Sequence, residues 1–256
     1  MTANSFFLSH PAQPESRVWI EGGEHHHLSR VARIRPGEKI GLFDEEGSQY
    51  RAVVEKVAGQ KTLVRILSRQ EADKPAITVV LAPALLKSRA MEFLVQKATE
   101  IALSALAPIQ AERSVVKIRS DPAAALVRWS RIAREAAKQC KTGWVPDIKK
   151  PQTLAEFLSG DASNLKLALN EGGGATLRDV LISESGATRP DSEGKAPASP
   201  GLRACLLVGP EGGWTPHEER LVGQAGFRPV SLGSSVLRTE TAALCAAFLV
   251  KHFLSP

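Results

Sequence analysis

The feature that most constrains this chain is a glycine-rich turn between a buried strand and a helix start, LVGPEGGWTPHEE at residues 207–219. The apolar run at residues 204–208 is continuous, which is typical of a strand buried on both faces of a parallel sheet. Beyond the turn, Thr215, Pro216 and Glu218 match the capping box of a helix that begins with proline. The turn lacks the lysine and the glycine spacing of common phosphate-binding loops. Any ligand held there is therefore expected to be something other than a phosphate.

Strands and helices alternate through the rest of this half of the sequence. Together they predict an α/β domain with a mainly parallel sheet. The predicted helix at residues 122–139 has an apolar stripe and an opposite basic face formed by Arg131, Arg134 and Lys138. Strands are predicted at residues 77–83, 105–110, 165–169, 204–208 and 229–232.

The first seventy residues follow a different pattern, in which short strands are separated by turn residues. Strands are predicted at residues 38–44, 48–57 and 62–67, where apolar positions alternate. This pattern predicts a small β-barrel or sandwich with one helix-like insert at residues 25–38. The arginines of that insert are Arg30, Arg33 and Arg35.

A polar linker at residues 71–76 separates the two patterns and marks a domain boundary. We therefore expect a β domain at residues 1–72 and an α/β domain at residues 73–256. Within the second domain, residues 183–201 are rich in Ser, Gly, Pro and Ala without periodicity. They are expected to form a flexible surface insertion.

Basic residues are concentrated in the middle of the chain. Residues 76–150 contain 13 Lys and Arg against 6 Asp and Glu, a net charge of +7 within a chain of +6. Such a cluster is typical of proteins that bind a phosphate backbone, because lysine and arginine displace its counterions. A solvated helix face would show the same charge, and composition leaves both interpretations open.

Cysteine use and hydropathy indicate a protein of a reducing compartment. The three cysteines are widely spaced and form no Cys-x-x-Cys pair, so neither a disulfide framework nor a zinc site is expected. The opening residues do not resemble a signal peptide, and the apolar run at residues 242–250 is too short to cross a bilayer. We expect a cytoplasmic protein with mostly buried thiols.

A second glycine-containing loop follows the strand predicted at residues 229–232, in the stretch SLGSSVLRTETAAL. Two such loops at the carboxyl edge of one sheet could hold a flat, uncharged or cationic ligand through backbone groups. The plainer interpretation is that these glycines only end strands and begin helices. The presence of two loops favours the ligand site.

The same residues carry a family resemblance. LVGPEGGWTPHEE and LGSSVLRTETAAL, with KSRAMEFLVQKATEIAL and ERSVVK upstream, resemble the bacterial 16S ribosomal RNA (uracil-N3)-methyltransferase family of the SPOUT class. The resemblance covers nearly the whole chain. It implies an N-terminal PUA-like barrel, a C-terminal α/β domain with a trefoil knot, S-adenosylmethionine held in the knot loops, and a homodimer.

The resemblance also implies roles for individual residues. Arg238 is expected to stabilise negative charge on the uracil ring, and Glu240 is a weaker candidate for the base. Residues implied in cofactor binding are Leu169, Gly209, Pro210, Glu211, Gly212, Leu232, Gly233, Val236, Leu237 and Thr239. Residues implied in RNA binding are Arg30, Arg33, Arg35, Lys87, Arg89, Arg113 and Lys117.

Two local features do not follow directly from the family resemblance. The adjacent residues His25, His26 and His27 lack nearby cysteine or carboxylate partners, so packing or capping is expected rather than a metal site. After Gln139, Lys141 and Thr142 occupy positions where the family has glycine and arginine, which puts a local RNA or dimer contact in doubt.

Three other functions remain open at this stage. The chain could be a SPOUT methyltransferase for another ribosomal or transfer RNA position, because the knot loops bind the same cofactor whatever the target. It could be a non-catalytic RNA-binding or ribosome-assembly factor. It could also be a small-molecule transferase, in which case ligand binding should not weaken steeply with salt.

Overall fold

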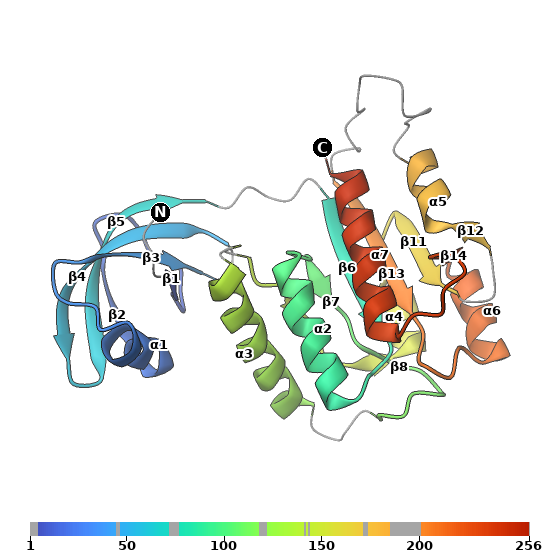
Figure 1. Cartoon of the computed structure of the whole chain (residues 1–256), viewed down its shortest axis with the longest axis horizontal. Coiled ribbons are helices and arrows are strands. Elements are labelled where there is room, and N and C mark those ends of the chain that lie inside the picture. The colour runs from blue at the N-terminus through green and yellow to red at the C-terminus, as the bar shows by residue number, and fades with distance from the viewer. Residues whose placement is uncertain are drawn as a thin grey trace. The chain divides into compact units, whose positions relative to one another are not determined.

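The computed structural model describes residues 5–44, 47–71, 77–117, 122–140, 142, 144–170, 174–184 and 201–255. These residues form two compact units (Figure 1). Unit 1 comprises Met1–Lys74 and Arg134–Val145, and unit 2 comprises Pro75–Ala133 and Pro146–Pro256. The boundary expected after residue 72 lies outside the described residues and stays a prediction.

Unit 1 is a curled five-stranded sheet. Its order is β1-β3-β4-β5-β2, in which β1 and β3 are parallel and the other pairs are antiparallel. The alternation predicted around Tyr50 is confirmed, since Tyr50, Ala52 and Val54 are buried opposite Val64 and Ile66. The strands are β1 (Ser5–Phe7), β2 (Arg17–Glu21), β3 (Lys39–Phe43), β4 (Gln49–Ala58) and β5 (Lys61–Gln70).

The helix-like insert of unit 1 begins earlier than predicted. It consists of α1 (Gly22–His26) and a π-helical segment, η1 (His27–Val31), whose Leu28 is fully buried in the core. The segment ends near Arg33, which has a φ of 54°. Side chains rarely adopt this left-handed conformation, because the Cβ atom approaches the following carbonyl.

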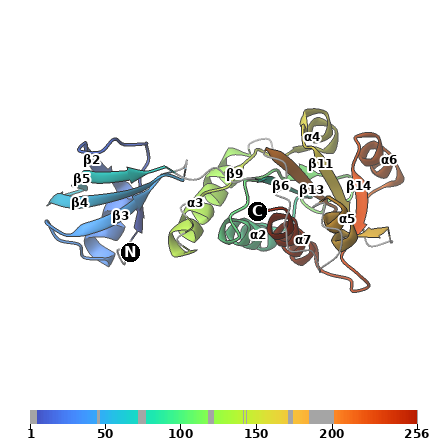
Figure 2. The same cartoon turned by 90° about the horizontal axis from the view of Figure 1, so that it is seen from above.

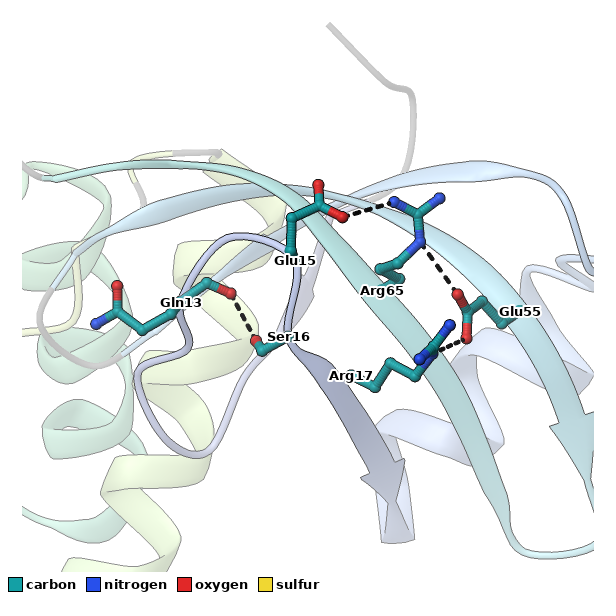
Figure 3. Close-up of polar contacts among 6 residues, drawn as sticks. All are labelled: Gln13, Glu15, Ser16, Arg17, Glu55 and Arg65. Atoms are coloured by element: carbon teal, nitrogen blue, oxygen red, sulfur yellow. Dashed lines mark hydrogen bonds and ion pairs between the residues drawn. The ribbon is translucent and has the colours of Figure 1, made fainter.

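A polar ladder crosses three elements of the unit 1 sheet (Figure 3). Glu55 on β4 accepts hydrogen bonds from Arg17 on β2 at 2.7 Å and from Arg65 on β5 at 3.1 Å, and Arg65 also reaches Glu15. These arginines lower the pKa of Glu55, and Glu55 raises the pKa of Arg17. The ladder leaves this face of the sheet with paired charges.

Unit 2 contains a seven-stranded, wholly parallel sheet of order β12-β14-β11-β13-β6-β7-β9. The predicted parallel sheet is therefore confirmed. Its strands are β6 (Ile77–Pro83), β7 (Ala105–Leu106), β9 (Asp147–Ile148), β11 (Leu165–Leu169), β12 (Ala175–Thr176), β13 (Leu202–Val208) and β14 (Arg228–Ser231). The short strands β8 (Ile109–Gln110) and β10 (Gln152–Thr153) form a separate parallel pair.

Helices cover both faces of this sheet (Figures 1 and 2). On one face lie α2 (Ser88–Glu100), α5 (Leu177–Glu184) and α7 (Thr239–Leu254), and on the other lie α4 (Leu154–Gly160) and α6 (Pro216–Gln224). Lys251 of α7 donates hydrogen bonds to the carbonyl oxygens of Ile101 and Ala102 at the end of α2, and burial lowers its pKa. Because all seven strands are parallel, their carboxyl ends lie on one edge of the sheet.

Some sequence expectations need correction. The strand expected at residues 105–110 is two strands, since Pro108 between them has no N–H for a continuous ladder. The helix predicted at residues 122–139 is α3 (Ala123–Cys140), but its basic face is only partly solvated. In unit 1, Lys138 is 8% exposed and pairs with Glu24, and Arg134 lies 5.1 Å from the Phe7 ring.

Other expectations lie partly outside the described residues. Of the insertion at residues 183–201, the first two residues belong to α5, and residues 185–200 are outside the described part. Lys141 is outside it as well. Among the cysteines, Cys205 is buried and its pKa is raised by burial, while Cys245 is exposed, against the expectation of mostly buried thiols. Each helix of the described part is too short or too polar to cross a membrane.

Candidate functional site

A cavity of about 320 Å³ lies at the carboxyl edge of the unit 2 sheet. Three neighbouring strands, β11, β13 and β14, end there at Leu169, Val208 and Ser231. The loops that follow β13 and β14 form most of the wall. Because ligands of open α/β sheets bind at this edge, and small-molecule pockets begin near this size, the cavity is the leading candidate site.

The cavity brings together most of the residues expected to bind the cofactor, although they come from three separate loops. Thr239 is the first residue of α7, so this helix begins at the cavity wall. The lining residues that the sequence suggested are Leu169, Gly209, Pro210, Leu232, Gly233, Val236, Leu237 and Thr239.

Two residues of the expected set are not part of the wall described by the structure. Glu211 and Gly212 are exposed at the tip of a turn closed by a 2.8 Å hydrogen bond from the Gly213 N–H to the Pro210 carbonyl. Gly213 has a φ of 68°, which favours glycine. Glu211 and Gly212 therefore lie outside the described lining, and their contact with the cofactor stays a prediction.

Sequence reasoning missed several other lining residues. Most of them directly follow or precede a residue that was identified, so their positions in the loops were a usable signal. Trp214, Glu219, Val230 and Ala242 adjoin no identified residue and gave no such signal. The missed residues are Asn170, Val208, Gly213, Trp214, Glu219, Val230, Ser234, Ser235 and Ala242.

Gly209 and Trp214 meet at the cavity wall. A Cβ atom on Gly209 would lie 3.0 Å from Cε2 and Nε1 of the Trp214 indole. Such a contact is too close for a rigid ring, so only glycine fits here without displacement. The Trp214 Nε1 atom is buried and has no hydrogen-bond partner among the described residues. Gly209 and the Trp214 indole therefore shape this part of the cavity wall by close contact.

Arg238 and Glu240 lie beside the cavity and are not part of its described lining. Arg238 is exposed and precedes the first turn of α7, between the lining residues Leu237 and Thr239. Glu240 is half-buried in that first turn, where a carboxylate suits the helix dipole. Both side chains are thus within one residue of the cavity wall along the chain.

The residues expected to bind RNA fall into two sets. In unit 1, Arg30, Arg33 and Arg35 are exposed and have no acidic partner among the described residues. In unit 2, Lys87 and Arg89 are exposed at the start of α2. The last two of the set, Arg113 and Lys117, are exposed but engaged with carbonyl oxygens.

The histidines do not form a metal site in the described residues. His25 is buried, and its ring nitrogens contact the Thr62 hydroxyl at 2.9 Å and the Gly59 carbonyl at 3.1 Å. This packing role agrees with the expectation from sequence. Across the described part, no group of three metal-ligating side chains is found.

Two family models place the chain in a class, that of RNA methyltransferases that carry a PUA domain. The RNA methyltransferase domain family matches residues 72–251, and the RNA methyltransferase PUA domain family matches residues 20–67. The chain belongs to the ribosomal RNA small subunit methyltransferase E family.

Relatives and solved structures agree with this assignment. Ribosomal RNA small subunit methyltransferase E of Synechocystis is 32% identical over 94% of this chain and 74% of its own length, and that of Bacillus subtilis is 31% identical over 91% and 89%. A Legionella pneumophila methyltransferase structure with bound SAM has a TM-score of 0.83 at 29% identity, covering 98% of both chains. The Neisseria gonorrhoeae methyltransferase E bound to S-adenosylmethionine has a TM-score of 0.80 at 28% identity, covering 97% of both.

Proposed function

We propose that this chain transfers a methyl group from S-adenosylmethionine to N3 of a uridine in the 16S RNA of the small ribosomal subunit. The observation that carries the proposal is the cavity between two glycine loops in a chain of this family. Methylation of ribosomal RNA is the function in the names of the relatives. The choice of uridine N3 rests on the resemblance of the two loop sequences.

The cavity fits S-adenosylmethionine in chemical terms. Its glycine loops leave backbone groups accessible, and Glu219 supplies a negative charge for a cationic ligand. The proposed binding set is Leu169, Gly209, Pro210, Glu211, Gly212, Leu232, Gly233, Val236, Leu237 and Thr239. When bound, S-adenosylmethionine supplies a methyl group on a positively charged sulfur.

The chain's own residues must make uracil N3 reactive. N3 carries a proton and becomes nucleophilic as that proton leaves, which spreads negative charge over the ring oxygens. Arg238 is exposed beside the cavity wall and is the proposed residue that stabilises this charge and orients the base. Glu240 is the candidate that accepts the proton. Its alternative role is to stabilise the helix dipole, and an activity profile over pH separates the two.

Unit 1 is proposed to hold the RNA as a PUA-like barrel. Its polar ladder pairs Arg17 and Arg65 with carboxylates (Figure 3), while Arg30, Arg33 and Arg35 have no such partner in the described part. Unpaired arginines are the ones free to displace counterions from phosphates. Lys87, Arg89 and Lys117 are proposed to extend the RNA contact along unit 2.

The finer architecture is also proposed from the family resemblance. We propose a SPOUT domain at residues 73–256 whose loops form a trefoil knot, a PUA-like domain at residues 1–72, a homodimeric assembly and a cytoplasmic location. Light scattering tests the dimer, because a monomer at working concentration would exclude a site shared between two copies.

Nucleoside mass spectrometry tests the reaction. Small subunits from cells lacking the gene are incubated with protein and S-adenosylmethionine, and restoration of 3-methyluridine is the expected result. A methyl restored at another nucleoside would point to a different target. No methyl transfer would favour a binding factor.

A matched variant tests Arg238. Arg238→Ala should lower 3-methyluridine formation by about a hundredfold or more, because a charge-stabilising donor is lost. Its affinities for S-adenosylmethionine and RNA should stay within about twofold of the original, a small change on the free-energy scale. Full activity in Arg238→Ala would overturn the assignment.

A further inference from the structure

We propose that Arg113 is a positioning residue that holds the cofactor loop in its binding conformation. The inference rests on the proposed function, since it concerns how that site is kept in shape. Here the cofactor loop means residues 209–215, and the strap means residues 111–117. The sequence suggests an RNA contact for Arg113, whereas the structure directs its guanidinium to the loop.

Arg113 holds the loop through two carbonyl groups. Its Nη1 atom donates to the Gly212 carbonyl at 2.9 Å and to the Trp214 carbonyl at 3.2 Å. The contact is close along the backbone as well, because a Cβ atom on Gly212 would lie 3.4 Å from the Arg113 Cβ. The two carbonyls flank Gly213, and both Gly213 and Trp214 line the cavity.

Glu218 holds the strap at a second point. This side chain is 3% exposed, and its Oε1 atom accepts a 2.8 Å hydrogen bond from the Glu112 N–H. Its Oε2 atom accepts from the Thr215 N–H at 2.9 Å, as part of the capping box of α6. One carboxylate therefore connects the strap to the end of the cofactor loop and to the start of the helix.

The strap itself is a defined turn. The Ala111 N–H donates to the Ser114 hydroxyl at 3.1 Å, the Ser114 N–H donates to the Ala111 carbonyl at 3.1 Å, and Ser114 is buried. Lys117 adds a 2.9 Å hydrogen bond to the Glu112 carbonyl. Arg113 thus extends from a fixed backbone, which lets its guanidinium restrain the loop.

The loop needs such restraint because of its composition. Gly209, Gly212 and Gly213 contribute no side chains that could pack, and glycine loses the most backbone freedom on ordering. A loop that is ordered before the ligand arrives spares that cost at the moment of binding. Arg113 supplies the ordering contact from a distant part of the sequence.

The test measures S-adenosylmethionine affinity by calorimetry in full-length protein without RNA. Arg113→Ala should bind about tenfold more weakly, as expected for one lost charge-assisted hydrogen-bonding group, and Arg113→Lys should recover part of the loss. Amide hydrogen exchange of residues 212–215 should quicken in the ligand-free Arg113→Ala protein. Arg220→Ala is the matched control, because Arg220 is an exposed arginine on α6 outside the loop and strap.

The outcomes separate the two proposals. If the original protein does not bind S-adenosylmethionine, the proposed function fails. If it binds, and Arg113→Ala binds equally well with unchanged exchange, the positioning role is overturned. The positioning role is also overturned if Arg113→Ala keeps its S-adenosylmethionine affinity but loses as much RNA affinity as Lys117→Ala does. Arg113 would then be an RNA-binding residue. A melting temperature close to the original confirms that the variant is folded.

Discussion

At the scale of single residues, the contact between Gly209 and Trp214 determines the shape of the cavity wall. The indole occupies the space that a side chain at residue 209 would need, and it also packs against the apolar core beneath α4 and α6. The ring cannot shorten or bend to relieve a clash. A change of one methyl group at Gly209 must therefore move Trp214 or the loop.

Gly209→Ala should weaken S-adenosylmethionine binding about tenfold or more and lower stability by about 1–3 kcal/mol, the usual cost of overpacking. Titration calorimetry and thermal melting measure the two effects. Gly223→Ala is the matched control, because a Cβ atom there meets nothing within 4 Å and Ala favours a helix over Gly by up to about 1 kcal/mol. Unchanged binding in Gly209→Ala would mean that the indole moves freely.

The sequence predicted many of the residues at the site and few of their partners. Local patterns predicted a strand, a glycine loop and a helix start here, and the family resemblance then named Leu237 and Thr239. The partners of Arg113 lie 99 and 101 residues away, so clustered charge and the family resemblance suggested RNA for a side chain that binds a loop. The outward turn at Glu211 was equally hidden, because glycine content does not specify which loop residues face a ligand.

At the scale of elements, the hairpin of β3 and β4 is closed by a buried polar group. Asp44 is 1% exposed and accepts hydrogen bonds from the Ser48 N–H at 2.9 Å and from the Tyr50 hydroxyl at 2.5 Å. Tyr50 is buried as well, and its hydroxyl accepts from the Ala12 N–H at 3.4 Å. Burial, followed by the Asp44 hydrogen bond, raises the pKa of Tyr50.

The raised pKa of Tyr50 predicts how stability changes in alkaline solution. Folding favours the neutral phenol, so its contribution is fully present below the unfolded pKa of about 10 and is lost as pH rises through the higher folded pKa. Tyr50 is the one tyrosine of the chain, so tyrosinate absorbance should report that folded pKa directly. An ordinary value near 10 would contradict the burial argument.

Tyr50→Phe extends this prediction. Its unfolding free energy should be about 1–3 kcal/mol lower at neutral pH, because Asp44 stays buried and loses one donor. The gap to the original protein should narrow as the solution becomes alkaline, since only the original loses the phenol's contribution. Denaturant unfolding at several pH values measures both effects, and a gap independent of pH would contradict the linkage.

Elements with strong periodicity were predictable, and those held by distant pairing were not. Strands β6, β11 and β13 are mostly apolar and were found within a few residues. Strand β1 has three residues and pairs with β3, some 36 residues away, which no local pattern reveals. The interpretation of Lys138 as part of a basic face of α3 was wrong for a similar reason, because its partner Glu24 lies 114 residues earlier in the sequence.

At the scale of the whole molecule, the basic side chains of the described residues are of two kinds. Some are paired with carboxylates, and others are not. The arginines of the polar ladder and Lys138 are matched by carboxylates, so they contribute little net field. Arg30, Arg33 and Arg35 remain unmatched within the described residues, as do the cations at the start of α2. The net charge of +6 is therefore concentrated on fewer surfaces than the composition suggests.

This division predicts two different responses to salt. RNA affinity should fall steeply as salt rises, because each phosphate contact releases counterions, whereas the affinity for one small S-adenosylmethionine molecule should change little. Replacing Arg30, Arg33 and Arg35 together by Gln should reduce the slope of log K against log salt by about 2, near 0.7 for each contact on a single strand. Fluorescence anisotropy with a small-subunit RNA fragment measures this slope.

Arg17→Gln is the control that makes the salt experiment decisive. Arg17 belongs to the same unit and is 65% exposed, yet it is paired with Glu55, so its loss should leave the slope nearly unchanged. If the triple variant keeps the original slope, unit 1 does not contact phosphates through these arginines. If the original protein shows no steep slope at all, RNA is not held by charge, and the small-molecule transferase becomes the better interpretation. Equal reductions in Arg17→Gln and the triple variant would show that ion pairing on the sheet does not neutralise an arginine toward RNA.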